Sequence, residues 1–326
     1  MVRTDVGYRR RLALVSVAAL LVCVSCVDRP LASSAPVTIR ISAGAVGASF
    51  SSPMSVALEQ VYNTLPNVSV RTVTRLGSDP SIEMLERGDA EMAINFADVA
   101  YAAFTGGLPD HPVPFHRLRA VALLERQALQ LVVSGKSPVR TTMDLAGRTA
   151  SLGSDRSASV LTATLVLNAY GLDVGRIRRE TSARRESLAD LAGGELDAMF
   201  LLSTYPIDPV RQAVTEGARL LPLAGPPIDR LIREYPFYSY VMIPRDTYPG
   251  QSQPVQTIGV NSILLCRVDL PDEVVYTLTK ALFDSLERPA SPRARFRWLD
   301  AEGASATPIP LHAGAARYYR ERELFP

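Results

Sequence analysis

Short turns rich in glycine and serine stand where predicted strands end and predicted helices begin. The first of these turns follows a strand predicted over residues 37–42 and carries Gly47, Ser49, Phe50 and Ser51. Free main-chain N–H groups and the positive end of the helix dipole meet at such a junction, so it favours negatively charged groups. The chemistry predicted from this turn is non-covalent capture of an anion.

Several later turns have the same composition and complete a set of candidate ligand-binding residues. These are Gly77, Ser78, Ser81, Asn95, Asp98, Ser154, Arg156, Ser157, Ser203, Thr204 and Tyr205. Because the carboxyl ends of parallel strands meet at one edge of a sheet, we expect these residues to face a shared cleft. A serine or aspartate before a helix is also a common helix cap, and for these residues that alternative stays open. Ser52, which precedes Pro53, is the predicted cap of the first helix.

The elements that must position these turns alternate between strands and helices. Runs of β-branched and apolar residues predict strands at 37–42, 68–74, 91–96, 118–123, 129–134, 149–152, 176–181, 198–202, 219–223 and 262–266. This alternation predicts an α/β fold with mostly parallel sheets. Gly88 and Gly171 each follow a helical stretch, where a glycine with positive φ ends a helix.

An internal echo predicts two similarly built lobes. Residues 85–92 and 191–198 share a leucine, a glycine three residues later and two acids at matching positions. Convergent turn chemistry is the alternative explanation. Without residues 1–26 the chain would have about 300 residues, and at that size one hydrophobic core usually divides into two. We therefore predict two lobes, each with its own sheet, and a ligand cleft between them.

The predicted lobes are discontinuous in sequence. Lobe 1 takes residues 37–127 and 256–326, and lobe 2 takes residues 128–255. The strands near 126–130 and 256–260 are the predicted hinge, because the chain passes between the lobes there.

The first 26 residues have the layout of a secretory signal, with basic residues before an uncharged apolar stretch at 12–24. That stretch is shorter than a membrane-spanning helix requires. Ser25 and Cys26 resemble a lipoprotein box, which predicts a lipid on Cys26, and ordinary cleavage is the alternative. Residues 27–36 would form a linker. We expect a periplasmic product, anchored to the membrane if Cys26 is lipidated.

Composition argues against several other classes of protein. The 35 basic and 33 acidic residues nearly cancel, which argues against nucleic acid or an anionic membrane as a partner. The sequence has no His-Glu-x-x-His motif, no Gly-x-Ser-x-Gly motif and no phosphate-binding loop. His111 and His116 have no cysteine or further histidine nearby to complete a metal site. We therefore expect no catalysis, no cofactor and no metal.

The order of several short motifs resembles the TAXI family of solute receptors for tripartite ATP-independent periplasmic (TRAP) transporters. The motifs that carry the resemblance are Gly77-Ser78, Gly88-Asp89-Ala90-Glu91, Ala97-Asp98-Val99-Ala100, Asp144-Leu145-Ala146-Gly147-Arg148, Leu196-Asp197-Ala198-Met199-Phe200, Tyr248-Pro249-Gly250-Gln251 and Ile309-Pro310-Leu311-His312-Ala313-Gly314-Ala315. The resemblance extends from residue 37 to residue 323.

The resemblance implies a type II periplasmic-binding-protein fold that closes on a small organic anion, such as an amino acid, an oxo acid or a dicarboxylate. It also implies delivery of the ligand to a TRAP-type membrane permease. Separately, we expect the protein to be a monomer. Ser49, Phe50 and Ser81 depart from the usual residues of that family, so its ligand is not transferred directly. The alternative partners are an ABC importer and a membrane sensor kinase.

Overall fold

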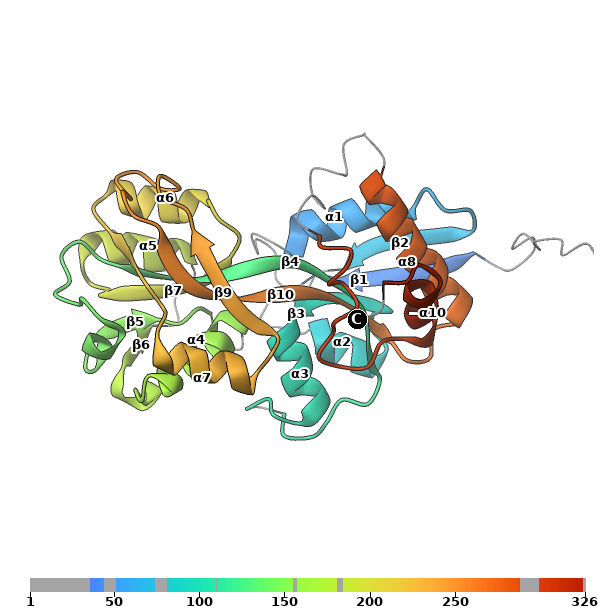
Figure 1. Cartoon of the computed structure of the whole chain (residues 1–326), viewed down its shortest axis with the longest axis horizontal. Coiled ribbons are helices and arrows are strands. Elements are labelled where there is room, and N and C mark those ends of the chain that lie inside the picture. Colours follow the sequence, from blue (N-terminus) through green and yellow to red (C-terminus); the bar gives the residue numbers. More distant parts are fainter. Residues whose placement is uncertain are drawn as a thin grey trace, which may run out of the picture. The chain divides into compact units, whose positions relative to one another are not determined.

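The computed structural model describes residues 36–43, 51–73, 81–109, 111–154, 157–180, 184–287 and 299–324 (Figure 1). The predicted signal segment and most of the predicted linker lie outside these ranges. The described residues belong to one unit, which begins at Pro36.

Ten strands are described. They are β1 (Val37–Ser42), β2 (Val68–Val73), β3 (Met92–Phe96), β4 (Leu118–Val133), β5 (Thr149–Ser151), β6 (Arg178–Glu180), β7 (Ala198–Ser203), β8 (Arg219–Leu221), β9 (Tyr238–Ile243) and β10 (Val255–Arg267). The strand at 37–42 has the predicted bounds, and most of the others start or end within two residues of the prediction. The strand β9 was not predicted, although its run Tyr-Ser-Tyr-Val-Met-Ile is rich in residues that favour strands.

The described helices lie between and after these strands. They are α1 (Ser51–Tyr62), α2 (Ser81–Arg87), α3 (Ala97–Thr105), α4 (Ala158–Ala169), α5 (Arg184–Gly193), α6 (Asp208–Thr215), α7 (Pro226–Glu234), α8 (Asp272–Glu287) and α10 (Ala313–Glu321), with short 3-10 turns at Thr142–Leu145 and Val174–Arg176. The helix α1 already includes Ser52, so the prediction that Ser52 is its cap is wrong. None of the helices described here has both the length and the apolar character needed to cross a bilayer.

The strands form a two-lobed α/β fold, as predicted, with the order β2-β1-β3-β10-β4-β7-β5-β6. The pairs β1–β2, β1–β3, β5–β6 and β5–β7 are parallel, whereas β4 and β10 run antiparallel to their neighbours. In addition, β9 pairs with β10 and β8 pairs with β4. Figure 1 shows β4 and β10 passing from one group of elements to the other. These two strands connect the lobes. The first lobe contains β1–β3, α1–α3, α8 and α10, and the second contains β5–β9 and α4–α7.

The prediction of a separate sheet in each lobe is wrong, because hydrogen bonding continues through β4 and β10. The strands predicted at 118–123 and 129–134 are the two halves of the single strand β4, which has 16 residues. The polar run Glu125-Arg126-Gln127 suggested a break there. The backbone nevertheless stays paired, since Arg126 and Gln127 lie opposite Asn261 and Val260 of β10.

Three apolar clusters hold the layers together. One, with Ile39, Leu58 and Tyr319, packs α1, α8 and α10 on the first lobe. A second, with Met199 and Val210, packs α5 and α6 on the second lobe. The third and largest runs along the other face of the sheet and includes residues of α2, α3, α4 and α7. This third cluster therefore joins the two lobes on that face.

The helix-ending turns follow the predicted glycine pattern. Gly88 and Gly171 have φ values of 82° and 81°, a left-handed conformation that glycine adopts without steric cost. The second member of the internal echo, Gly194, has a φ of 90°. The same turn therefore recurs before β3 and before β7, as the echo predicted.

Asp269 gives a prediction of pH-dependent stability. It accepts hydrogen bonds from Arg267 at 2.7 and 2.8 Å and from Arg117 at 2.9 Å, which lower its pKa to about 2. A lowered carboxyl pKa stabilises the folded state above the unfolded pKa of about 3.9, and this contribution disappears as the pH falls towards 2. Because the side chain is 46% exposed, we expect Asp269→Asn to cost no more than about 1 kcal/mol at pH 7. Urea unfolding of both proteins should show this difference shrinking between pH 5 and pH 2.5, and a constant difference would contradict the assignment.

Candidate functional site at the crossing strands

Six of the predicted ligand-binding residues lie outside the described part of the chain: Gly47, Ser49, Phe50, Gly77, Ser78 and Arg156. Cys26, the predicted lipidation site, lies outside it as well. Ser51 is the first residue of α1. The roles of these residues stay predictions.

Ser81 and Asn95 form a pair inside the first lobe. The side-chain amide of Asn95 donates to the hydroxyl of Ser81 at 2.8 Å, and both side chains are buried. The oxygen of the same amide accepts from the N–H of Phe96 at 2.7 Å. These contacts fix the start of α2 against the end of β3.

Asp98 joins the two lobes. Its Oδ2 accepts hydrogen bonds from the hydroxyls of Thr162 in α4 (2.6 Å) and Tyr238 in β9 (2.8 Å). Its Oδ1 accepts from the N–H of Val99 at 2.8 Å. Burial raises the pKa of Asp98, and the three donors oppose this shift. The carboxylate is therefore already engaged by protein donors.

The polar side chains at the end of β7 and in the turn after it have different environments. Ser203 is buried and accepts from the amide of Gln130 at 2.9 Å, while Tyr248 donates to the oxygen of the same amide at 2.6 Å. Burial raises the pKa of Tyr248 to about 12, so the hydroxyl stays protonated and keeps donating. Thr204 and Tyr205, the next residues, line a pocket instead.

The turn before α4 carries the two remaining predicted residues. Ser154 is exposed. Ser157 precedes the helix without capping it, and its hydroxyl oxygen is buried with no partner among the described residues.

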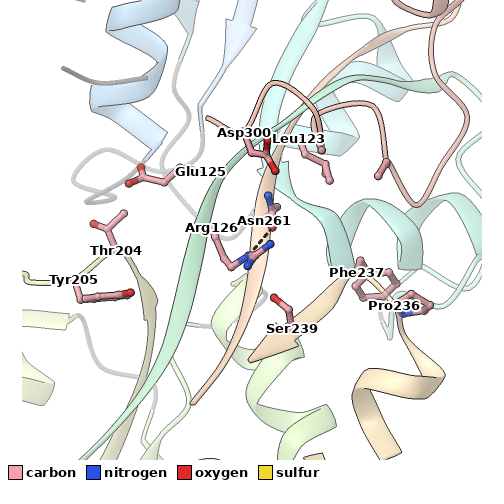
Figure 2. A pocket seen from close by; sticks show the side chains of 12 residues that line it. Leu123, Glu125, Arg126, Thr204, Tyr205, Pro236, Phe237, Ser239, Asn261 and Asp300 are labelled. Atoms are coloured by element: carbon pink, nitrogen blue, oxygen red, sulfur yellow. Dashed lines mark hydrogen bonds between the residues drawn. The ribbon is translucent and has the colours of Figure 1, made fainter. Parts of the chain in front are cut away.

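The pocket lies over the crossing strands and has a volume of about 500 Å³ (Figure 2). Its lining comes from β4, from the turn after β7, from β9 and the segment that leads into it, from β10, and from the segment before α10. The lining residues are Leu123, Glu125, Arg126, Thr204, Tyr205, Pro236, Phe237, Ser239, Asn261, Asp300, Gly303 and Ala306. The pocket therefore receives residues from both lobes.

Among the described residues that line the pocket, Arg126 alone carries a positive charge. Figure 2 shows its guanidinium in the middle of the pocket, where its Nε donates to Oδ1 of Asn261 at 3.2 Å. Burial raises the pKa of the Tyr205 hydroxyl, and the positive charge of Arg126 partly opposes this shift. The Tyr205 hydroxyl donates to the main-chain oxygen of Met242 at 3.3 Å. A guanidinium beside hydroxyl and amide groups can hold a carboxylate through paired hydrogen bonds.

Two carboxylates, those of Glu125 and Asp300, lie in the same lining. With Arg126 they give the pocket charges of both signs. A guest that carries both a carboxylate and an ammonium group matches this distribution better than a dianion does, because a second negative charge would meet like charges.

Strand register places this pocket on one face of the crossing strands. Arg126 pairs with Asn261, and both line the pocket. The adjacent pair, Gln127 and Val260, points to the opposite face, because successive residues in a strand alternate. Tyr238 lies opposite Val260 and shares that second face with it. The pocket and the Asp98 cluster are therefore on opposite faces.

Other residues considered for chemistry have structural contacts. His312 caps α10, with its Nδ1 accepting from the N–H of Gly314 at 3.2 Å, which is a structural role. Cys266 is fully buried, and burial raises the pKa of its thiol, which disfavours the reactive thiolate. Within the described ranges, no three His, Cys, Asp or Glu side chains are grouped closely enough to hold a metal ion.

Sequence reasoning assigned Arg126 to the hinge and missed it as a lining residue, and it missed Asn261, Ser239 and Asp300 altogether. A signal for Arg126 was present, since the polar run 125–127 interrupts an otherwise apolar strand. No comparable signal exists for Ser239 or Asp300, because they reach the pocket only through the tertiary fold.

Comparisons with known proteins agree with this architecture. A family model described as NMT1-like matches residues 41–322. The periplasmic binding protein BugD superposes with a TM-score of 0.54 at 14% identity, covering 90% of this chain and 94% of that chain. A putative periplasmic sulfonate-binding protein, SsuA from Methylobacillus flagellatus, gives 0.51 at 14% identity, with 88% and 95% covered. A Xanthomonas citri protein bound to ATP gives 0.53 at 12% identity, with 87% and 94% covered. These likenesses confirm the predicted periplasmic-binding-protein fold.

Proposed function

Because the chain belongs to the NMT1-like family, and because its two lobes share a polar pocket, we propose that it is a non-catalytic solute receptor of the periplasm. The observation that carries this proposal is the position of the pocket. It lies on β4 and β10, the strands that connect the lobes, so a rotation about these strands would change its width. Such a site can enclose a small guest and release it by reopening.

The proposed ligand is a small organic acid, and an amino acid fits best. Its carboxylate would pair with Arg126 and accept from Tyr205 or Thr204, while its ammonium group would lie near Glu125 or Asp300. The predicted turns that carry Gly47, Ser49, Phe50, Ser51, Gly77, Ser78, Ser154, Arg156 and Ser157 would complete the enclosure. Ser81, Asn95, Asp98 and Ser203 would support it from behind, since their polar atoms already bond within the protein.

The proposed partner is a TRAP-type permease, on the strength of the TAXI resemblance. An ABC importer is the second candidate, favoured by the fold shared with a sulfonate-binding component of such a transporter. Export by residues 1–26, a lipid on Cys26, a monomeric state and the lobe boundaries at 127/128 and 255/256 belong to the same proposal. Mass spectrometry of the exported protein would identify its first residue and any lipid on Cys26.

A ligand screen tests the pocket directly. Thermal unfolding should be measured against a panel of amino acids, oxo acids and dicarboxylates, because a ligand at a hundred times its dissociation constant stabilises by about 2.7 kcal/mol. For a compound that binds, Arg126→Gln should weaken the affinity by at least about tenfold, since it removes a charge-assisted hydrogen bond. Tyr205→Phe should weaken it less, because the ring remains.

The matched control is Arg245→Gln, since Arg245 is 74% exposed and not part of the lining. The Arg245→Gln variant should bind the compound with the same affinity as the wild type. If Arg126→Gln and Arg245→Gln bound the compound equally well, the pocket on the crossing strands would not be the ligand site.

A further inference from the structure

The face of the crossing strands opposite the pocket carries a polar contact between the lobes. Asp98 is 2% exposed and lies at the start of α3, directly after β3 of the first lobe. Its two hydroxyl donors, Thr162 and Tyr238, come from α4 and β9 of the second lobe. Buried hydrogen bonds are electrostatically stronger than exposed ones, because the local dielectric is low. This carboxylate therefore holds α3 against two elements of the other lobe.

Aromatic contacts extend the same junction. Tyr101 lies one helical turn after Asp98, so both side chains lie on the same face of α3. Its ring centroid is 5.3 Å from that of Phe237 and 6.4 Å from that of Tyr235, the latter in an edge-on arrangement. These ring contacts therefore cross from α3 to the segment that leads into β9. Phe237 also lines the pocket, so it lies beside both features.

A second side chain on this face, that of Gln127, destabilises the packed state, whereas the Asp98 contact stabilises it. Gln127 lies beside Val260, which in turn lies beside Tyr238, so the three share one face of the sheet. Gln127 is fully buried, and neither atom of its amide has a hydrogen-bond partner among the described residues. Burying an unpaired amide costs free energy that is recovered when water reaches it. Gln127 therefore carries an unfavourable burial on the same face of the sheet as the Asp98 contact, and opening of that face to water relieves it.

We propose that Asp98 is an interlobe latch, opposed by Gln127, and that the balance between the two sets how readily α3 separates from α4 and β9. Both residues lie on the face of the crossing strands that is turned away from the pocket. A rotation about β4 and β10 that narrows the pocket must then widen the junction at Asp98, because the two lie on opposite faces of the same strands. The latch would resist closure until ligand contacts outweigh it, and this last consequence rests on the proposed function.

Hydrogen–deuterium exchange of the ligand-free protein tests the latch without any ligand. Tyr238→Phe and Thr162→Val each remove one hydrogen bond to Asp98, and Asp98→Ala removes both. Exchange in α3 and at the start of β9 should become faster together, on the order of tenfold for each buried hydrogen bond removed. Gln127→Leu removes the unpaired amide and should slow exchange in the same two segments.

The matched control is Tyr240→Phe, which removes a hydrogen bond of 2.7 Å to Asp229 inside the second lobe. This control should make exchange faster around α7 and leave the exchange rate of α3 unchanged. The latch is overturned if the three latch variants leave α3 and β9 at the wild-type rate, if they speed exchange equally in β1 and β5, or if Gln127→Leu speeds it. If the expected pattern appears although no compound of the screen binds, the latch stands and the proposed function fails.

Discussion

Replacement of Gln130 by leucine is expected to destabilise the protein by about 2–4 kcal/mol, because each buried polar group left without a partner costs about 1–3 kcal/mol. Gln130 is 1% exposed and links β4 to the second lobe through both ends of its amide. Without it, the Tyr248 hydroxyl loses its acceptor and the Ser203 hydroxyl loses its donor. Urea unfolding measured by circular dichroism would give the free energy of unfolding.

Gln212→Leu is the matched control for this substitution. Gln212 donates to Glu216 at 3.0 Å on the exposed surface of α6, where water replaces the lost hydrogen bond. We expect a change of no more than about 0.5 kcal/mol. Equal effects of the two substitutions would mean that the buried network at Gln130 contributes nothing to stability.

The double substitution Gln130→Leu with Tyr248→Phe tests how much of the lost stability comes from the unpaired Tyr248 hydroxyl. Removing the Tyr248 hydroxyl also removes one of the groups stranded by the first change, so the two effects should not add. The double variant should be more stable than the sum of the single variants predicts, by about 1 kcal/mol or more.

The alternation of strands with helices and the glycine residues in the turns predicted the fold, because both are local signals in the sequence. The strand at 37–42 and the glycine turns at Gly88 and Gly194 depend on residues close together in the chain, and the structure has them where predicted. The continuity of β4 is not a local property. Its polar residues 125–127 stay in the strand because β10 provides backbone partners from more than 130 positions away.

The candidate site was predicted only in part for the same reason. The turn after β7 was identified, and Thr204 and Tyr205 do line a pocket between the lobes. The sequence could not show that Asp98 and Ser203 turn inwards, because their partners Thr162, Tyr238 and Gln130 are distant in sequence. A serine or aspartate at a strand end looks the same whether it meets a ligand or another side chain.

Gly259→Ala is expected to have the second large effect, because it acts on the crossing strands themselves. A Cβ atom at this position of β10 would lie 2.5 Å from Cγ2 of Val241 and 2.7 Å from the main-chain oxygen of Gln127. Both distances are shorter than carbon contacts allow, and the second involves backbone, which cannot rotate away. Overpacking of this kind costs about 2–3 kcal/mol.

The same substitution should also alter the pocket. The added methyl group would lie 3.4 Å from Cγ of Arg126, and relief of the clash requires β10 to move away from β4 at that point. We therefore expect Gly259→Ala to weaken binding of any compound that depends on Arg126, in addition to lowering the free energy of unfolding. Thermal unfolding with and without such a compound measures both effects in one experiment.

Two further variants make the cause of that effect testable. Gly107→Ala is the control for the loss of a glycine, since its added Cβ would meet nothing closer than 3.7 Å. Val241→Ala combined with Gly259→Ala removes the side-chain clash and leaves the one with the Gln127 oxygen. The double variant should therefore recover only part of the lost stability. Full recovery would show that β4 and β10 do not need to approach so closely, and that a larger residue at 259 is excluded by Val241 alone.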